Sequence, residues 1–318
     1  MKKTFANLFI LFSLFAVQQL HAKPDTVNIG AYVMSLHDIN FHDKEYTARF
    51  WLWFTHSNPK FNFLNQIDIP NAKSVETPEK IVSDKGKVRW ELMKMKCTMK
   101  QPWSVEDFPF DRQLLNIQIE NVLWEKNDLI FKPDTKGSKL DKTMAVEGWI
   151  VDKFVVSNGV HNYPTSFGDP EAKVDNSDYA TFNIAIELKR NAWGLFFKLF
   201  IGMYIAFFIS LVTFLLDPAD IEPRFGLPVG ALFAAVGNKY IIDSILPETT
   251  SFTLVDTLHA ITFSCIFFTI LTCAISLLLV ERNKKNYAIK VNKIGGYAVI
   301  SLFGISNLMF ITFAILRG

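Results

Sequence analysis

Cysteine is scarce in this chain of 318 residues, and its scarcity excludes two kinds of protein. The three cysteines are Cys97, Cys265 and Cys273. Cys97 stands alone in the polar part of the chain, and the other two are too far apart along one apolar run to form a disulfide. No cysteine–histidine spacing typical of a zinc site occurs. The sequence therefore predicts neither a disulfide scaffold nor a structural metal site.

An excess of charge of one sign is also missing. The chain has 33 Lys and Arg against 31 Asp and Glu, a formal net charge of +2. This near balance leaves no basic surplus for binding the phosphates of a nucleic acid. The nucleophile elbow, the phosphate-binding P-loop and the zinc-protease motif are absent from the sequence. We therefore predict no nucleic-acid partner, no cofactor, no metal and no enzymatic activity.

Long apolar runs are absent from residues 23 to about 190 but dominate the chain after Asn191. Half of all residues are hydrophobic, and the mean hydropathy is +0.19. A helix needs about 20 apolar residues to cross a bilayer. Four runs are long enough, and they predict a four-helix transmembrane domain over residues 191–318, with helices at about 193–216, 225–246, 254–280 and 294–316.

The first 22 residues have the pattern of a secretory signal peptide, although an uncleaved anchor is the alternative. Lys2 and Lys3 precede the apolar run Leu8–Val17, and Leu20-His21-Ala22 forms an acceptable cleavage site. Export of the domain that follows makes the loop 281–293 cytoplasmic. That loop contains Arg282, Lys284, Lys285, Lys290 and Lys293, in agreement with the positive-inside rule.

Residues 23–190 show the alternation of apolar and polar side chains that is typical of β-strands. Clusters of Gly, Pro, Asn and Asp separate the alternating runs, which indicates an antiparallel β-sandwich. The clearest runs are Thr47–Phe54, Leu114–Ile119, Trp149–Val156 and Tyr179–Leu188.

A β-sandwich followed by four apolar helices resembles the pentameric ligand-gated ion channels, or Cys-loop receptors. The segment Trp103–Gln113 contains Phe108-Pro109-Phe110-Asp111 and then Gln113, similar to the core of that family's Cys-loop. Arg190 matches the arginine that precedes the family's first helix. The flanking cysteines and a large cytoplasmic domain are missing, as in the prokaryotic branch. The resemblance implies a homopentamer in the bacterial inner membrane, multi-pass, with its sandwich in the periplasm.

The resemblance also implies a set of residues that couples the sandwich to the membrane. In this set Asp43 and Asp111 share the guanidinium of Arg190, next to Pro109 and Phe110, and Pro247 lies in the loop that follows the second helix. The alternative is a set of ordinary solvated surface charges. His42 precedes Asp43 and is the candidate pH sensor; the alternative is a solvated loop histidine.

The second predicted helix is the candidate for the pore lining. Steps of three and four residues place seven residues on one face: Glu222, Gly226, Gly230, Phe233, Gly237, Tyr240 and Ser244. In a five-fold assembly, Glu222 would form a carboxylate ring that favours monovalent cations. A helix-dipole role is the alternative for Glu222. Phe233 is either a hydrophobic gate or a side chain packed between helices.

Several residues of these helices depart from the family's pattern. Gly226 and Gly230 replace polar pore residues, Pro228 interrupts the second helix, and Gly202 stands where the first helix usually has proline. The alternative function is therefore a receptor-like membrane protein of the same fold with a collapsed, non-conducting pore. An exported binding module held by a helical anchor is a further alternative, although four helices exceed what an anchor needs.

The agonist is not defined by the sequence and is either a proton or an unknown small molecule. Trp149, Tyr163, Phe167 and Tyr179 are candidates for an aromatic site that binds a cation, and most of them are equally plausible as core residues of the sandwich.

Two lysines of the predicted helices also need partners. Lys239 pairs either with Asp243 in its own helix or with a neighbouring subunit. Lys198 either extends to the interface or pairs with Asp243 or Asp256.

Overall fold

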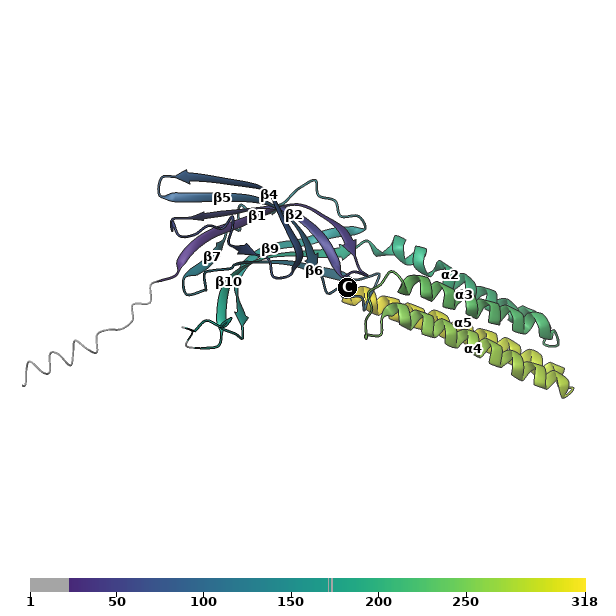
Figure 1. Ribbon diagram of the computed structural model, residues 1–318. Helices are drawn as coiled ribbons and strands as arrows, with labels where there is room; N and C mark the ends of the chain where they lie inside the picture. The colour runs from purple at the N-terminus through teal and green to yellow at the C-terminus, as the bar shows by residue number, and fades with distance from the viewer. Residues whose placement is uncertain (1–22, 171, 173) are drawn as a thin grey trace, which may run out of the picture.

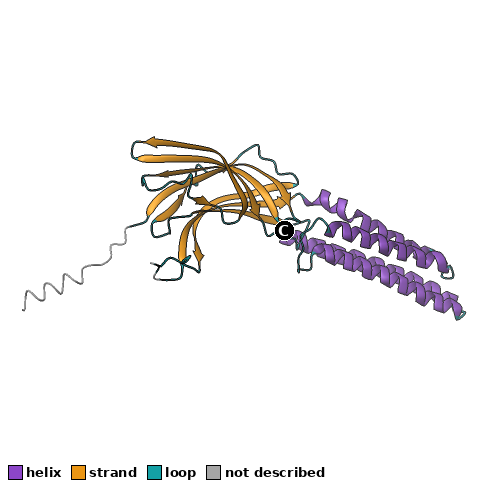
Figure 2. Ribbon diagram, in the orientation of Figure 1, coloured by secondary structure: helices purple, strands orange, loops and turns teal. Residues whose placement is uncertain are grey.

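The computed structural model describes residues 23–170, 172 and 174–318. The predicted signal peptide, residues 1–22, lies outside this part of the chain. The described chain is elongated, with the strands at one end and the long helices at the other (Figures 1 and 2). The C-terminus lies at the junction between the two (Figure 1), so the last helix ends beside the sheets.

The strands form two sheets, which confirms the predicted β-sandwich. The larger sheet has the order β4-β5-β2-β1-β7, and β8 pairs with β1. The smaller has the order β3-β6-β10-β9. The strands of the larger sheet are β1 Asp25–Asn40, β2 Glu45–His56, β4 Ala72–Lys85, β5 Val88–Lys100, β7 Leu129–Pro133 and β8 Lys139–Leu140; those of the smaller are β3 Ile67–Asp68, β6 Arg112–Asn121, β9 Trp149–Tyr163 and β10 Ser177–Arg190.

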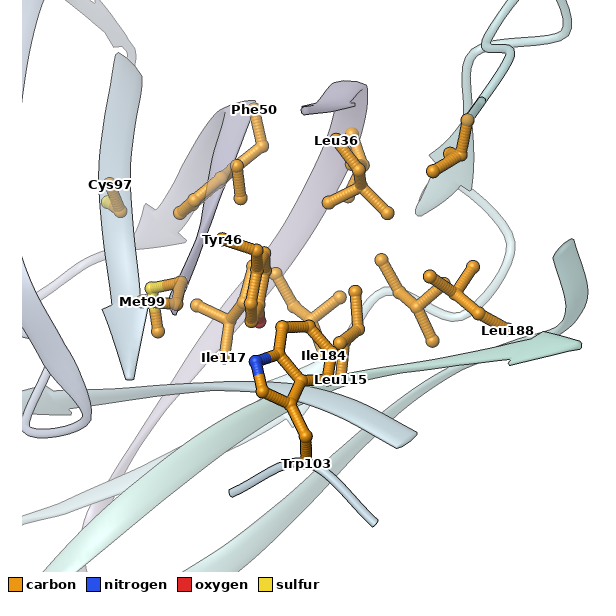
Figure 3. Close-up of a cluster of buried hydrophobic side chains, with 14 of the residues drawn as sticks. Leu36, Tyr46, Phe50, Cys97, Met99, Trp103, Leu115, Ile117, Ile184 and Leu188 are labelled. Carbon is orange, nitrogen blue, oxygen red and sulfur yellow. The ribbon is translucent and has the colours of Figure 1, made fainter. Parts of the chain in front are cut away.

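The four alternating runs of the sequence fall inside β2, β6, β9 and β10, and their apolar faces fill the space between the sheets. In β2, Phe50, Leu52 and Phe54 are fully buried, whereas Arg49 faces outward. Tyr46 and Phe50 of one sheet lie opposite Leu115, Ile117 and Ile184 of the other (Figure 3). Burying one such large apolar side chain contributes about 1.5–3 kcal/mol. Cys97 belongs to this core, and burial raises the pKa of its thiol to about 12.

The four helices are long and apolar enough to cross a membrane. They are α2 Ala192–Val212, which continues as a 3-10 turn at Thr213–Leu215, α3 Ile221–Asp243, α4 Leu254–Glu281 and α5 Lys285–Arg317. Two helices begin earlier than the apolar runs, α3 at residue 221 rather than 225 and α5 at residue 285 rather than 294. Hydropathy marks only the part of a helix that fits the hydrocarbon, so it misses polar turns at the ends.

Pro228 does not interrupt α3, contrary to the expectation from sequence. A proline within a helix leaves the carbonyl four residues earlier without its usual donor. That carbonyl belongs to Arg224, and the Thr213 hydroxyl donates to it at 3.2 Å. Pro228 is buried against the other helices. A hydroxyl from the preceding helix therefore replaces the lost hydrogen bond and lets α3 run unbroken.

Candidate functional site

Arg190 and Asp111 form a buried ion pair at the membrane end of the sandwich. Arg190 ends β10, and Asp111 immediately precedes β6. The Arg190 Nε atom lies 2.6 Å from Asp111 Oδ1, and Nη2 lies 3.1 Å from Oδ2. Their side chains are only 9% and 2% exposed. Gln113 Nε2 also donates to Asp111 Oδ2 at 2.6 Å, so the carboxylate is well satisfied. Such bidentate pairs fix direction as well as distance.

Three aromatic rings surround the guanidinium of this pair. The Arg190 Cζ atom lies 3.9 Å from the ring centre of Trp149, 4.8 Å from that of Phe41 and 4.9 Å from that of Phe108. Phe41 and Trp149 stack on one another. The structure therefore places Trp149 at the junction and not with the other ligand-site candidates. Trp149 of β9 lies opposite Arg190 of β10 in the sheet. The alternating pattern of either strand does not predict this pairing register.

Asp43 does not share Arg190, and this part of the predicted coupling set is corrected. Its carboxylate accepts a hydrogen bond from Asn40 Nδ2 at 2.7 Å and faces His42 Nδ1 at 3.0 Å. Its own N–H donates to Asn40 Oδ1. These local bonds, typical of an Asx turn, hold Asp43 within the β1–β2 turn. The hydrogen bond from His42 is the main cause of the lowered pKa of Asp43. His42 is therefore paired with Asp43, whereas Arg190 is paired with Asp111.

The segment from Trp103 to Asp111, here called the proline loop, touches three helices. Phe110 packs against Trp193 and Phe196 of α2, with ring centres 5.3 and 5.5 Å away. The N–H of Leu254, the first residue of α4, donates to Glu106 O at 2.7 Å. Arg317 at the end of α5 pairs with Glu106 at 3.5 Å. The proline loop thus contacts the ends of α2, α4 and α5.

The loop between α3 and α4 meets the β1–β2 turn. Pro247 is buried in this loop. Next to it, Glu248 O accepts a hydrogen bond from Lys44 Nζ at 3.5 Å. The sandwich therefore contacts the helices at two places. One is the proline loop, in which Pro109 is buried, and the other is the contact between the β1–β2 turn and the loop from α3 to α4.

The predicted pore face of α3 points away from the other helices of the chain. Its seven residues, Glu222, Gly226, Gly230, Phe233, Gly237, Tyr240 and Ser244, are all exposed. Phe233 is 71% exposed and Tyr240 is 77% exposed. A Cβ placed at any of the three glycines would meet nothing within 4 Å. The opposite face packs on the bundle through Ala231 and Ala235. Phe233 is therefore not packed between helices of its own chain.

Arg224 is a site residue that the sequence reasoning missed. It is 1% exposed, although it is charged and lies in the first turn of α3. Its Nη2 donates to Asn292 Oδ1 of α5 at 2.5 Å and lies 3.6 Å from Cys273 Sγ of α4. No carboxylate within 4 Å pairs with it among the residues that the structure describes. Arg224 thus joins three helices on the side of α3 opposite to Glu222, and no periodic signal in the sequence predicts this.

The charges near the sandwich end of the bundle form one group. Lys239 Nζ lies 2.7 Å from Asp243 in its own helix and 2.7 Å from Asp256 Oδ1 of α4. Its partners are therefore in the same chain, one within α3 and one on the neighbouring helix. Neither Asp243 nor Asp256 lies within 4 Å of the ammonium of Lys198, which is exposed on α2.

A pocket of about 380 Å³ lies at the other end of β9 and β10. Tyr163 lines this pocket, and its ring centre lies 5.4 Å from that of Phe167 and 5.7 Å from that of Tyr179. Three of the four aromatic ligand candidates are thus together, without Trp149. The remaining walls are Asp68, Glu120, Asn121 and Val122.

Glu120 supplies the buried acid of this pocket. Its side chain is 4% exposed. His161 Nδ1 lies 2.5 Å from Glu120 Oε1, and the Tyr163 hydroxyl donates to Oε2 at 3.0 Å. Burial and this hydrogen bond raise the pKa of Tyr163 to about 12. The sequence reasoning missed Glu120, although its place at the end of the alternating run of β6 marks it as an acid close to the core.

Comparison with known proteins supports the resemblance at a distance. No protein-family model matches the chain. Over 219 residues the chain is 21% identical to a glutamate-gated chloride channel of Drosophila melanogaster. The match covers 69% of this chain but only 44% of that relative. Together with the sandwich and the four apolar helices, this similarity fits the fold of the Cys-loop receptors.

Proposed function

We propose that this protein is a ligand-gated ion channel built from five copies of the chain, selective for monovalent cations. It resides in the bacterial inner membrane with its sandwich in the periplasm. The observation that carries the proposal is the exposed face of α3. That face combines a carboxylate, three glycines and two aromatic rings on a helix long enough to cross a bilayer.

Contact with lipid does not account for this face. Glu222 would place a charge against hydrocarbon or headgroups, and the glycines offer little apolar surface. Around a shared symmetry axis the same residues line a water-filled path. Glu222 then forms a ring of carboxylates at the end of α3 farthest from the sandwich. Phe233 forms an apolar constriction that stops ions by excluding water.

Cation selectivity is argued from this chain's own charges. Glu222 is exposed on the pore face, whereas Arg224, two residues later, is buried on the opposite side. A carboxylate ring without a facing cation attracts cations and repels anions. The relative named above is a chloride channel, whereas the ring proposed for this chain favours cations.

One observation favours a second candidate, a receptor of the same fold that does not conduct. Gly226, Gly230 and Gly237 leave open space along the pore face of α3. Small residues at such spacing allow helices to approach one another closely. Five α3 helices could then meet on the axis and close the path.

The first test concerns assembly. We expect native mass spectrometry of the detergent-purified protein to show five subunits, because a closed ring lets the pore faces of all α3 helices line one shared path. Phe233→Lys should weaken the ring, since it places five ammonium groups together in the narrow apolar constriction, whereas the apolar change Phe233→Leu should not. A monomer or dimer as the sole species would refute the pore argument.

The second test concerns the ligand, which we propose to be a small organic cation held by the Glu120 pocket. Tetramethylammonium is a suitable probe, because aromatic faces and a carboxylate bind it without a specific hydrogen bond. Glu120→Gln should raise the dissociation constant of tetramethylammonium about 10- to 100-fold. This corresponds to the loss of roughly 1.5–3 kcal/mol, the free energy typical of a contact with a charged group. Isothermal titration calorimetry measures the change.

The matched control for this binding test is Glu79→Gln, which removes an exposed acid of the other sheet. We expect no change in binding for this variant. Equal binding to the wild type and to Glu120→Gln would show that the pocket is not the cation site.

A further inference from the structure

His259 lies inside the helical bundle and faces an acceptor with each of its ring nitrogens. It belongs to α4 and is completely buried. Its Nδ1 lies 2.8 Å from Val255 O, and its Nε2 lies 3.1 Å from Asn238 Oδ1 of α3. The function proposed above makes no use of this residue.

Asn238 is itself held in one orientation. Its Nδ2 donates to Leu199 O of α2 at 2.9 Å. Gly202 makes room for this contact, because a Cβ there would stand 3.2 Å from Asn238 Nδ2. A chain of hydrogen bonds thus runs from α4 through α3 to α2.

A count of hydrogen-bond donors shows that this chain of hydrogen bonds is complete only when His259 carries a second proton. A neutral imidazole has one N–H and donates to one acceptor only. With neutral His259, either Val255 O or Asn238 Oδ1 faces a ring nitrogen without hydrogen. Turning the Asn238 amide over only moves the conflict to Leu199 O, which the amide oxygen would then face. The imidazolium has two N–H groups and satisfies all the contacts at once.

The charges around His259 also suit a proton. On α3 are Lys239 and Asp243, and on α4 is Asp256. One ammonium and two carboxylates leave one net negative charge in this group. From α2, the ring of Phe200 packs on the imidazole, with its centre 5.8 Å away. Burial opposes the charged ring, whereas the two acceptors and the net negative charge favour it.

We propose that His259 is a proton-binding site in the half of the bundle nearest the sandwich, and that protonation completes the hydrogen-bond chain α4–α3–α2. The protonated ring holds α3 against α2 and α4, and the neutral ring releases one of these contacts. Acidification therefore selects one position of α3. An effect on conduction rests on the proposed function, but the binding of the proton and the movement of α3 do not.

The first experiment observes the ring itself. Protein with ¹⁵N-labelled histidine rings is placed in liposomes, and solid-state NMR spectra are recorded from about pH 8 to pH 4, a range that spans imidazole titration. The His259→Gln variant identifies the His259 signals by their loss. We expect these signals to change from one protonated nitrogen to two. A ring that stays neutral at pH 4 overturns the proposal, whether or not the protein conducts.

The second experiment observes α3. A spin label on Val236→Cys, at an exposed position of α3, reports distances between subunits, while the three native thiols are buried. We expect acidification to shift these distances in the wild-type background and to leave them unchanged with His259→Gln or Asn238→Leu. His37→Gln, in the sandwich, is the control and should shift like the wild type.

The outcomes separate the two proposals. A protonated His259 with a shift of α3 but no current at any pH supports the proton site and counts against the channel function. Protonation without a shift, or a shift that persists in His259→Gln, overturns the role of His259 in positioning α3.

Discussion

Arg190→Gln is expected to abolish gating while the sandwich and the helices remain folded. The variant leaves Asp111 buried without its cation and removes the guanidinium that Trp149, Phe41 and Phe108 enclose. Breaking one side of a buried ion pair costs about 3–5 kcal/mol. The loss falls where β10 passes into α2, so the strand end and the proline loop no longer move together. Planar-bilayer recording measures gating, and thermal unfolding in detergent measures stability.

A double-mutant cycle separates coupling from stability. Arg190→Gln combined with Asp111→Asn replaces the ion pair by two neutral amides, and we expect it to regain part of the lost stability but not the gating. Lys96→Gln is the control, because its pair with Glu76 is exposed and is worth about 0–1 kcal/mol. Normal gating by the Arg190→Gln variant would show that the buried pair only stabilises the fold.

Glu222→Lys should turn the cation preference of the pore into an anion preference. Five carboxylates at one end of the path become five ammonium groups, so the sign of the local potential reverses. The reversal potential in a potassium chloride gradient measures this directly. We expect the reversal potential to move from near the equilibrium potential of potassium towards that of chloride. The reversal potential of Glu222→Ala should lie between those of the wild type and Glu222→Lys.

Glu281→Lys provides the matched control for selectivity. Glu281 is an exposed acid at the end of α4, on the same side of the membrane as Glu222 but on another helix. We expect the reversal potential of this variant to stay near that of the wild type. A conducting Glu222→Lys channel that keeps its cation preference would place Glu222 away from the axis.

The division of the chain into a sandwich and four helices followed from the sequence alone, because both signals are local. Side chains alternate along a strand with a period of two, as in β2 and β10, and a membrane helix needs one long apolar run. The face of α3 that begins at Glu222 was likewise visible, since steps of three and four residues define a helical face without any knowledge of its neighbours.

The partners of the site residues were decided only by the tertiary structure, because they depend on contacts between distant segments. Arg190 meets Asp111 and not Asp43, since local hydrogen bonds hold Asp43 in its own turn. The register of β9 and β10 places Trp149 beside Arg190 at the junction. Glu120 and Tyr163 line the pocket at the other end of the sandwich.

The polar contacts inside the bundle depend in the same way on how the helices are rotated about their axes. Thr213 supports α3 at Pro228, and Asn238 joins α4 to α2 through His259. In a membrane every buried polar group must find a partner within the protein. Which partner it finds depends on the packing of helix against helix, and an apolar run of sequence does not encode that packing.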